Sequence, residues 1–261
     1  RRKKDYTFRG WGLQTTTSLP WTEDVKNKTS KKFIENVKIL DEKIKQREFY
    51  LAQITNHYEN SSFEDVFKHY KTLSYRSYVI HFSSLLAFNN TKSKNIVECG
   101  SAEGLSTFFC IRNYYQDKDF KAYLYDSWEK MRAKELVNDE DLLRMGNYDY
   151  LNIDIIKKNL KEYEENIIYN KGFIPEVLNL NTTKNPEELS WLHIDLNSAF
   201  PTTKALEFFY PKIEKKGIIL LDDYGHKNFS QTRVAAETFF QNKDVDFLQF
   251  MTGQAMIIKK S

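Results

Sequence analysis

The sequence is poor in cysteine, proline and glycine, with 2, 5 and 9 residues of these types among 261. Cys99 and Cys110 form no C-x-x-C pair and lie in apolar segments. We therefore expect buried free thiols rather than a disulfide or a thiolate metal site. Free thiols suit a reducing compartment, and we expect a cytoplasmic protein. The scarcity of proline and glycine argues against long disordered or low-complexity regions.

Long apolar runs and a strong excess of one charge are also missing. No run approaches the length of a transmembrane helix and no signal peptide is visible, so we expect no membrane association. The net charge of +3 is too small to indicate nucleic-acid binding. The chain begins at Arg1 rather than at a methionine, as expected for a piece of a longer protein.

The length suits one α/β domain with an additional helical or lid segment, and we expect three parts. Residues 1–30 contain a GWG turn and no periodic pattern, which predicts a lid over a site or a tail packed on the core. Residues 31–92 have apolar positions at helical spacing and could supply the surface of a homodimer. Residues 93–261 form the third part.

In residues 93–261, strand patterns alternate with helix patterns, which indicates a mainly parallel sheet with helices on both faces. Two strand patterns at the end of the chain are separated only by a short turn and predict an antiparallel hairpin. The predicted strands cover residues 96–99, 122–126, 166–169, 191–195, 217–223, 245–250 and 255–259. The predicted helices cover residues 78–88, 105–115, 153–163, 203–210 and 232–240.

Polar residues after the first two strands point to a nucleoside cofactor, because ligands of such sheets bind beyond the carboxyl ends of the strands. The first strand runs into the pattern E-x-G-x-x-x-G, formed by Glu98, Gly100, Ser101 and Gly104. Asp126 ends the second strand and could accept both hydroxyls of a ribose, or could simply cap a helix. The dinucleotide pattern G-x-G-x-x-G is incomplete, which disfavours NAD and favours S-adenosylmethionine.

Three carboxylates follow the next two strands. Asp195 ends the fourth predicted strand, and Asp222 and Asp223 end the fifth. If these strands are neighbours, the three acids meet at one edge of the sheet, where their mutual repulsion favours a divalent cation. An all-oxygen set suits Mg²⁺, Mn²⁺ or Ca²⁺. The alternative is a polar turn, which the long apolar strand before the two acids makes the weaker interpretation.

Taken together, these motifs resemble the macrocin O-methyltransferase family over residues 10–225. The resemblance rests on segments 98–104, 125–127, 192–195 and 217–225, and on the tryptophan-rich segments 10–13 and 20–21. It implies a Rossmann-like class I methyltransferase fold with a seven-stranded, mostly parallel sheet and an antiparallel last strand. It also implies S-adenosylmethionine contacts from the glycine turn, Asp126 and Ser127, and Mg²⁺ held by Asp195, Asp222 and Asp223.

The resemblance implies methylation of a sugar hydroxyl, on a surface-polysaccharide precursor or a glycosylated natural product. Family members usually have a second acid and a tyrosine after the first metal aspartate. Here Asn197 and Ala199 stand at those positions, so the acceptor is expected to differ from macrolide sugars.

The acceptor hydroxyl needs a base, and Asp195 and His226 are the candidates. We interpret His193 as a packed core residue. A catechol-type methyltransferase would use the same cofactor and metal. A nucleotide-sugar oxidoreductase would need the complete dinucleotide pattern, and a non-catalytic binding domain with this fold is a further alternative.

Overall fold

The computed structural model describes residues 75–114, 117, 119–131, 148–225 and 230–261. The chain divides into two compact units, Arg1–Tyr78 and Val79–Ser261. The predicted lid and most of the predicted helical segment lie outside the described residues.

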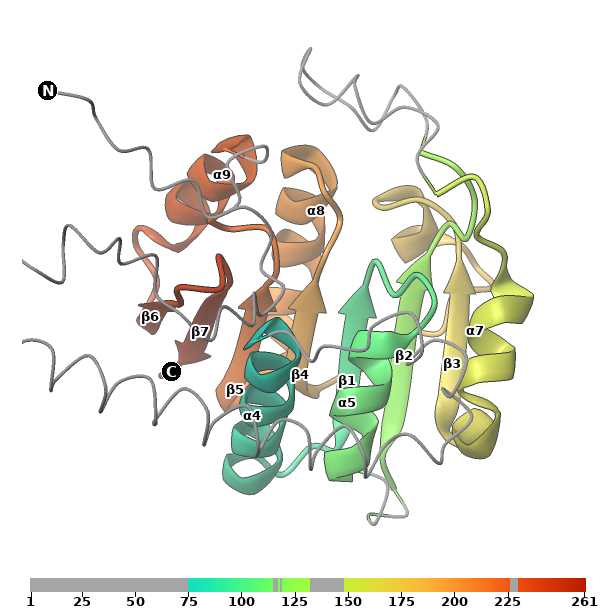
Figure 1. Ribbon diagram of the computed structural model, residues 1–261. Helices are drawn as coiled ribbons and strands as arrows, with labels where there is room; N and C mark the ends of the chain where they lie inside the picture. Colours follow the sequence, from blue (N-terminus) through green and yellow to red (C-terminus); the bar gives the residue numbers. More distant parts are fainter. Residues whose placement is uncertain (1–74, 115–116, 118, 132–147, 226–229) are drawn as a thin grey trace, which may run out of the picture. The chain divides into compact units, whose positions relative to one another are not determined.

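A seven-stranded sheet forms the centre of the second unit, with the strand order β3-β2-β1-β4-β5-β7-β6. The first five strands pair in parallel, and β7 pairs antiparallel with both β5 and β6. The arrowheads of β1 to β5 therefore point to the same edge of the sheet (Figure 1). The strands are β1 (Asn95–Cys99), β2 (Lys121–Asp126), β3 (Ile167–Lys171), β4 (Leu189–Ile194), β5 (Ile213–Leu221), β6 (Val245–Gln249) and β7 (Ala255–Lys259).

Helices cover both faces of the sheet (Figure 1). On one face lie α4 (Tyr75–Asn90), α5 (Leu105–Tyr114) and α7 (Ile153–Asn159), and on the other lie α8 (Ala199–Phe209) and α9 (Ser230–Phe240). Short 3-10 helices cover Lys161–Asn166, Glu176–Asn179 and Tyr210–Lys212. The predicted α/β fold with helices on both faces is confirmed, including the antiparallel end of the sheet.

The central strands are apolar because both of their faces are covered, as is usual in parallel sheets. All six residues of β4 are buried, whereas the edge strand β6 has only exposed or half-buried residues. On the side of α8 and α9, Phe209, Phe240 and Ile219 belong to one buried apolar cluster. This core fixes the strand ends that carry the site.

Three predicted boundaries differ from those of the structure by several residues. β5 begins at Ile213, four residues before the predicted start, because the polar residues 214–216 still belong to the strand. α7 ends at Asn159, and a separate 3-10 helix replaces the end of the predicted helix 153–163. α8 begins at Ala199, earlier than predicted, after the N-cap residue Ser198.

Both cysteines are buried and free, as predicted. Within the described ranges, no helix combines the length and the apolar character that crossing a membrane requires.

Candidate active site

A cleft opens at the carboxyl edge of the parallel strands, with a volume of about 740 Å³ that includes space open to solvent. Its walls come from the loops that follow β1, β2, β3 and β4. Gly100, Asp126, Ser127 and Asp195, which were all predicted as site residues, line this cleft. The topology explains this convergence, because parallel neighbours β2, β1 and β4 end at one edge.

The glycine turn after β1 lies directly against the backbone of the first predicted metal ligand. Gly100 has a φ of +85°, and a β-carbon on it would lie 1.8 Å from the carbonyl oxygen of Asp195. The amide of Asp195 donates to the carbonyl of Cys99 over 2.8 Å, and the amide of Gly100 donates to the carbonyl of Tyr125 over 2.8 Å. Only glycine fits this position, for both its conformation and the space available.

Asp126 holds the loops after β1 and β2 together. Its two carboxylate oxygens accept the backbone N–H groups of Ala102 over 2.8 Å and of Trp128 over 2.7 Å. The indole of Trp128 donates to the carbonyl of Ala102 over 2.9 Å, which closes the link. Burial raises the pKa of Asp126, against the lowering effect of the two backbone hydrogen bonds. Asp126 lines the cleft, where a ribose is expected.

The other predicted cofactor residues take different positions. Ser101 is buried, and its hydroxyl has no hydrogen-bond partner in the described part of the chain. Such an unpaired buried hydroxyl fits a bound polar ligand. Gly104 has a φ of +88° and packs against Ile156, since a β-carbon there would lie 2.8 Å from that side chain. Ser127 lines the cleft, and its hydroxyl donates to the carbonyl of Glu129 over 3.2 Å.

The three predicted metal ligands come together. Asp195, Asp222 and Asp223 each offer a carboxylate oxygen, and these oxygens all lie within 4.8 Å of one another. Asp195 is half-buried, while Asp222 and Asp223 are only 4% and 5% exposed. β4 and β5 are hydrogen-bonded neighbours, which brings their ends together. Clustered, largely buried carboxylates with oxygen donors fit Mg²⁺ or a similar hard cation.

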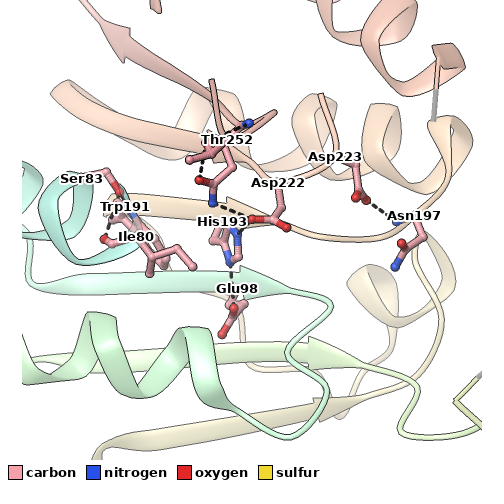
Figure 2. Close-up of polar contacts among 10 residues, drawn as sticks. Ile80, Ser83, Glu98, Trp191, His193, Asn197, Asp222, Asp223 and Thr252 are labelled. Carbon is pink, nitrogen blue, oxygen red and sulfur yellow. Dashed lines mark hydrogen bonds and ion pairs between the residues drawn. The ribbon is translucent and has the colours of Figure 1, made fainter. Parts of the chain in front are cut away.

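Each of the two adjacent aspartates has its own hydrogen-bond donor. The amide group of Gln254 donates to Oδ1 of Asp222 over 2.7 Å. The backbone N–H of Asn197 donates to Oδ2 of Asp223 over 3.0 Å (Figure 2). Asn197 has a φ of 54°, a conformation that asparagine tolerates better than most residues. Asn197 lines the cleft, whereas Ala199 at the start of α8 does not.

Glu98, also predicted as a cofactor residue, is not among the residues that line the cleft, and its side chain contacts Thr107 of α5. It is 2% exposed, and its carboxylate accepts hydrogen bonds from Thr107 and, over 2.8 Å, from Nδ1 of His193. His193 is fully buried, as predicted for a core residue, and its Nε2 lies 3.5 Å from Oδ1 of Asp222. Figure 2 shows His193 between Glu98 and Asp222.

Tyr148 is a cleft residue that the sequence analysis missed. Its hydroxyl accepts a hydrogen bond from the side-chain amide of Asn197 over 3.3 Å. Burial raises the pKa of Tyr148, and the nearby carboxylates of Asp195 and Asp223 raise it further, so the phenol stays protonated. Tyr148 follows a charged segment without periodicity, and no sequence signal marks it. His226, the second candidate base, lies outside the described residues.

Known proteins with a similar sequence or fold bear on what this site does. Residues 97–224 match the sequence profile of a family described as a methyltransferase domain. This range contains the glycine turn, Asp126 and all three clustered aspartates. No protein with a curated function matches the sequence.

Solved structures with the same fold include several methyltransferases. The O-methyltransferase NovP aligns with a TM-score of 0.59 at 15% identity, over 71% of this chain and 80% of NovP. The calicheamicin methyltransferase CalS11 aligns with a TM-score of 0.55 at 13% identity, over 70% of this chain and 77% of CalS11. TomG from Streptomyces achromogenes, an O-methyltransferase solved in complex with S-adenosylmethionine, has a TM-score of 0.54 at 10% identity, over 82% of this chain and 99% of TomG. The chain therefore contains a methyltransferase domain and has the fold of the class I, S-adenosylmethionine-dependent O-methyltransferases.

Proposed function

We propose that this protein transfers a methyl group from S-adenosylmethionine to a hydroxyl of a sugar or sugar-containing acceptor, with the help of a divalent cation. The observation that carries the proposal is the position of the three clustered aspartates. They lie at the strand ends that adjoin the glycine turn, and Asp195 lines the same cleft as Gly100 and Asp126. The proposed metal site and the proposed cofactor loop would thus meet at one cleft through Asp195.

The cofactor side of the cleft would consist of the glycine turn, Ser101, Asp126 and Ser127. Gly100 lines the cleft, and the unpaired hydroxyl of Ser101 can donate to a polar group of the cofactor. Asp126 can accept hydrogen bonds from ribose hydroxyls. These contacts would place the methyl group within the cleft and in line with the acceptor oxygen. Such alignment of the reacting atoms supplies much of the acceleration in a displacement reaction.

The acceptor side would consist of Asp195, Asp222 and Asp223 with Asn197 and Tyr148. S-adenosylmethionine supplies an electrophilic methyl group, and a cation on the three carboxylates supplies a Lewis acid that weakens the acceptor O–H bond. Asp195 is the half-buried member of the three and lines the cleft, so it can take the acceptor proton; His226 is the other candidate base. As the oxygen–carbon bond forms, the carbon–sulfur bond breaks.

The choice of a sugar acceptor rests on the sequence resemblance to the macrocin O-methyltransferases. Tyr148 and Asn197 line the cleft, and their hydroxyl and amide groups could bind a polar acceptor. An aromatic hydroxyl is the second candidate, since a catechol would use the same cofactor and metal.

A substrate panel tests the proposal. The full chain with S-adenosylmethionine and Mg²⁺ would be offered nucleotide sugars, simple glycosides and catechols, and methyl transfer would be followed by mass spectrometry with and without EDTA. We expect methylated sugar, and loss of product with EDTA. Transfer only to catechols would replace the acceptor class, and transfer unaffected by EDTA would exclude the metal role.

Calorimetry separates the two non-methyltransferase alternatives. We expect S-adenosylhomocysteine to bind and NAD not to bind. Tight NAD binding with no response to S-adenosylhomocysteine would favour an oxidoreductase. Binding of S-adenosylhomocysteine without transfer to any acceptor would favour a binding domain.

A further inference from the structure

A line of buried polar side chains crosses three neighbouring strands and ends at a predicted metal ligand. We propose that Gln254 and the buried pair Glu98 and His193 are positioning residues that fix the carboxylate of Asp222 for a divalent cation. Glu98 belongs to β1 and His193 to β4, and Asp222 directly follows β5 (Figure 2). This inference rests on the proposed function, because it assigns a purpose to residues that support the metal site.

The first member, Glu98 on β1, is buried, and each of its carboxylate oxygens has a hydrogen-bond partner. It lies opposite His193 in the register of β1 and β4. Thr107 of α5 donates to one carboxylate oxygen and Nδ1 of His193 donates to the other, the latter over 2.8 Å. Burial of a carboxylate is costly unless good hydrogen-bond partners compensate for it. Apolar residues would fill this place at no such cost.

The orientation of His193 is fixed by its neighbours. Its ring stacks on Trp191 with a centroid distance of 5.4 Å and an interplanar angle of 29°. The Trp191 indole donates to the hydroxyl of Ser83 over 3.0 Å, and Ser83 donates to the carbonyl of Ile80 over 3.1 Å. Figure 2 shows these residues to one side of His193. The ring is thereby held with Nδ1 toward Glu98 and Nε2 toward the metal ligand.

Nε2 of His193 is the unusual atom of this line. It is buried and makes no hydrogen bond within the described residues, and it lies 3.5 Å from Oδ1 of Asp222. A buried polar nitrogen without a hydrogen bond needs an explanation. The place of the ring beside Asp222, where it limits how that carboxylate can turn, provides one.

Gln254 lies in the turn before β7 and contacts the same Asp222 oxygen, Oδ1. Its side-chain Nε2 donates to Oδ1 of Asp222 over 2.7 Å. Its side-chain oxygen Oε1 accepts from the Thr252 hydroxyl over 2.9 Å. Gln254 is fully buried and Thr252 is 6% exposed. Because Thr252 occupies the oxygen of the amide, the amide nitrogen is the end that faces Asp222. Oδ1 of Asp222 thus accepts a hydrogen bond from the turn before β7 and lies 3.5 Å from Nε2 of His193 on β4.

The physical reason for such a line is the orientation of a metal ligand. Carboxylates that bind metals are usually hydrogen-bonded by further residues, and loss of such a partner typically weakens metal affinity by about 10- to 100-fold. A purely structural polar line would have no need to end at one of three clustered carboxylates. The line also joins the strand of the glycine turn to the metal site across β4.

Mn²⁺ titration of the full chain tests the inference, with calorimetric binding of S-adenosylhomocysteine as the second readout. We expect Gln254→Ala to weaken Mn²⁺ binding by about 10- to 100-fold and to leave S-adenosylhomocysteine binding within about twofold. Gln241→Ala, at an exposed turn, is the matched control and should bind both as the unmodified chain does. Thr252→Val keeps the side-chain volume, removes the hydroxyl that orients Gln254, and should weaken Mn²⁺ binding by about 2- to 10-fold.

Glu98→Gln separates the positioning role from a direct cofactor role. It keeps the shape and removes the charge, and we expect weaker Mn²⁺ binding with unchanged S-adenosylhomocysteine binding. If it weakens only S-adenosylhomocysteine binding, Glu98 belongs to the cofactor site and not to this line. If Gln254→Ala and Thr252→Val both bind Mn²⁺ as tightly as the unmodified chain, the inference is overturned while the proposed function stands. Failure of the unmodified chain to bind Mn²⁺ overturns the metal role in both proposals.

Discussion

The backbone of Gly100 touches the backbone of Asp195: a β-carbon on the glycine would lie 1.8 Å from the carbonyl oxygen of the aspartate. The turn expected to hold the cofactor and the first expected metal ligand are therefore one structural unit. A side chain added at Gly100 must therefore displace the backbone of Asp195, because the two backbones leave no room for it.

Replacement of Gly100 by alanine should disturb both halves of the site. Alanine at a φ of +85° is strained, and its methyl group would displace Asp195. We expect the free energy of unfolding to fall by more than about 2 kcal/mol. Binding of both Mn²⁺ and S-adenosylhomocysteine should be lost, as measured by calorimetry on the folded fraction at low temperature.

Gly104→Ala is the matched control for this substitution. Gly104 has nearly the same φ, +88°, but its β-carbon would meet the flexible side chain of Ile156. We expect a comparable conformational penalty and nearly normal Mn²⁺ binding. Equal loss of Mn²⁺ binding in the two variants would show that backbone strain, and not the contact with Asp195, is responsible.

Replacement of Asp222 by asparagine should remove the response of the protein to metal without unfolding it. An amide oxygen can still accept the hydrogen bond from Gln254, and one charge fewer relieves repulsion among the three carboxylates. In EDTA we expect a melting temperature equal to or higher than that of the unmodified chain. Addition of Mg²⁺ should raise the melting temperature of the unmodified chain and leave the variant unchanged.

The exposed residue Asp119 provides the control for this experiment. Asp119→Asn should retain the full Mg²⁺ response. A normal Mg²⁺ response in Asp222→Asn would exclude Asp222 from the ligand set.

Tyr148→Phe should weaken acceptor binding and little else. The substitution removes the hydroxyl that accepts from Asn197 over 3.3 Å, on a residue that lines the cleft. The loss of one hydrogen bond corresponds to a rise in the acceptor KM of about 2- to 10-fold. Steady-state kinetics should show this rise, while binding of Mn²⁺ and S-adenosylhomocysteine stays constant. An unchanged KM would place the acceptor elsewhere in the cleft.

The two cysteines predict a loss of stability at alkaline pH. Burial raises the pKa of both thiols well above 9.0, and the charge of Glu98 adds to the effect. The folded state therefore keeps protons that the unfolded state releases above its ordinary thiol pKa. The free energy of unfolding should fall as the pH rises through that range, by up to about 1.4 kcal/mol per pH unit for each thiol.

Urea denaturation at pH 8 and pH 10 measures this dependence. The double variant Cys99→Ala with Cys110→Ala should have a shallower pH dependence, and a thiol reagent at pH 8 should label the folded chain only after urea is added. An identical slope in the double variant would assign the pH dependence to other groups.

The sequence by itself determined the succession of strands and helices along the chain and the residues at the strand ends. The alternation of strand patterns with helix patterns predicted the α/β fold. Acids at the ends of two strands predicted a carboxylate cluster, and the structure brings one oxygen of each acid within 4.8 Å of the others. These features are local, because a strand's apolar residues and the polar residue that ends it are neighbours in the chain. Boundaries were less accurate at β5, where polar residues continue the strand.

The contacts between distant segments depend on the tertiary structure. Tyr148 comes to the cleft from a segment without a pattern, and Gln254 reaches Asp222 from 32 positions away. Glu98 looked like a cofactor residue because it precedes the glycine turn. The alternation of side chains along β1, however, turns it toward Thr107 and His193. Chain position determined which residues end a strand, and only the packing of sheet and helices decided which way each side chain faces.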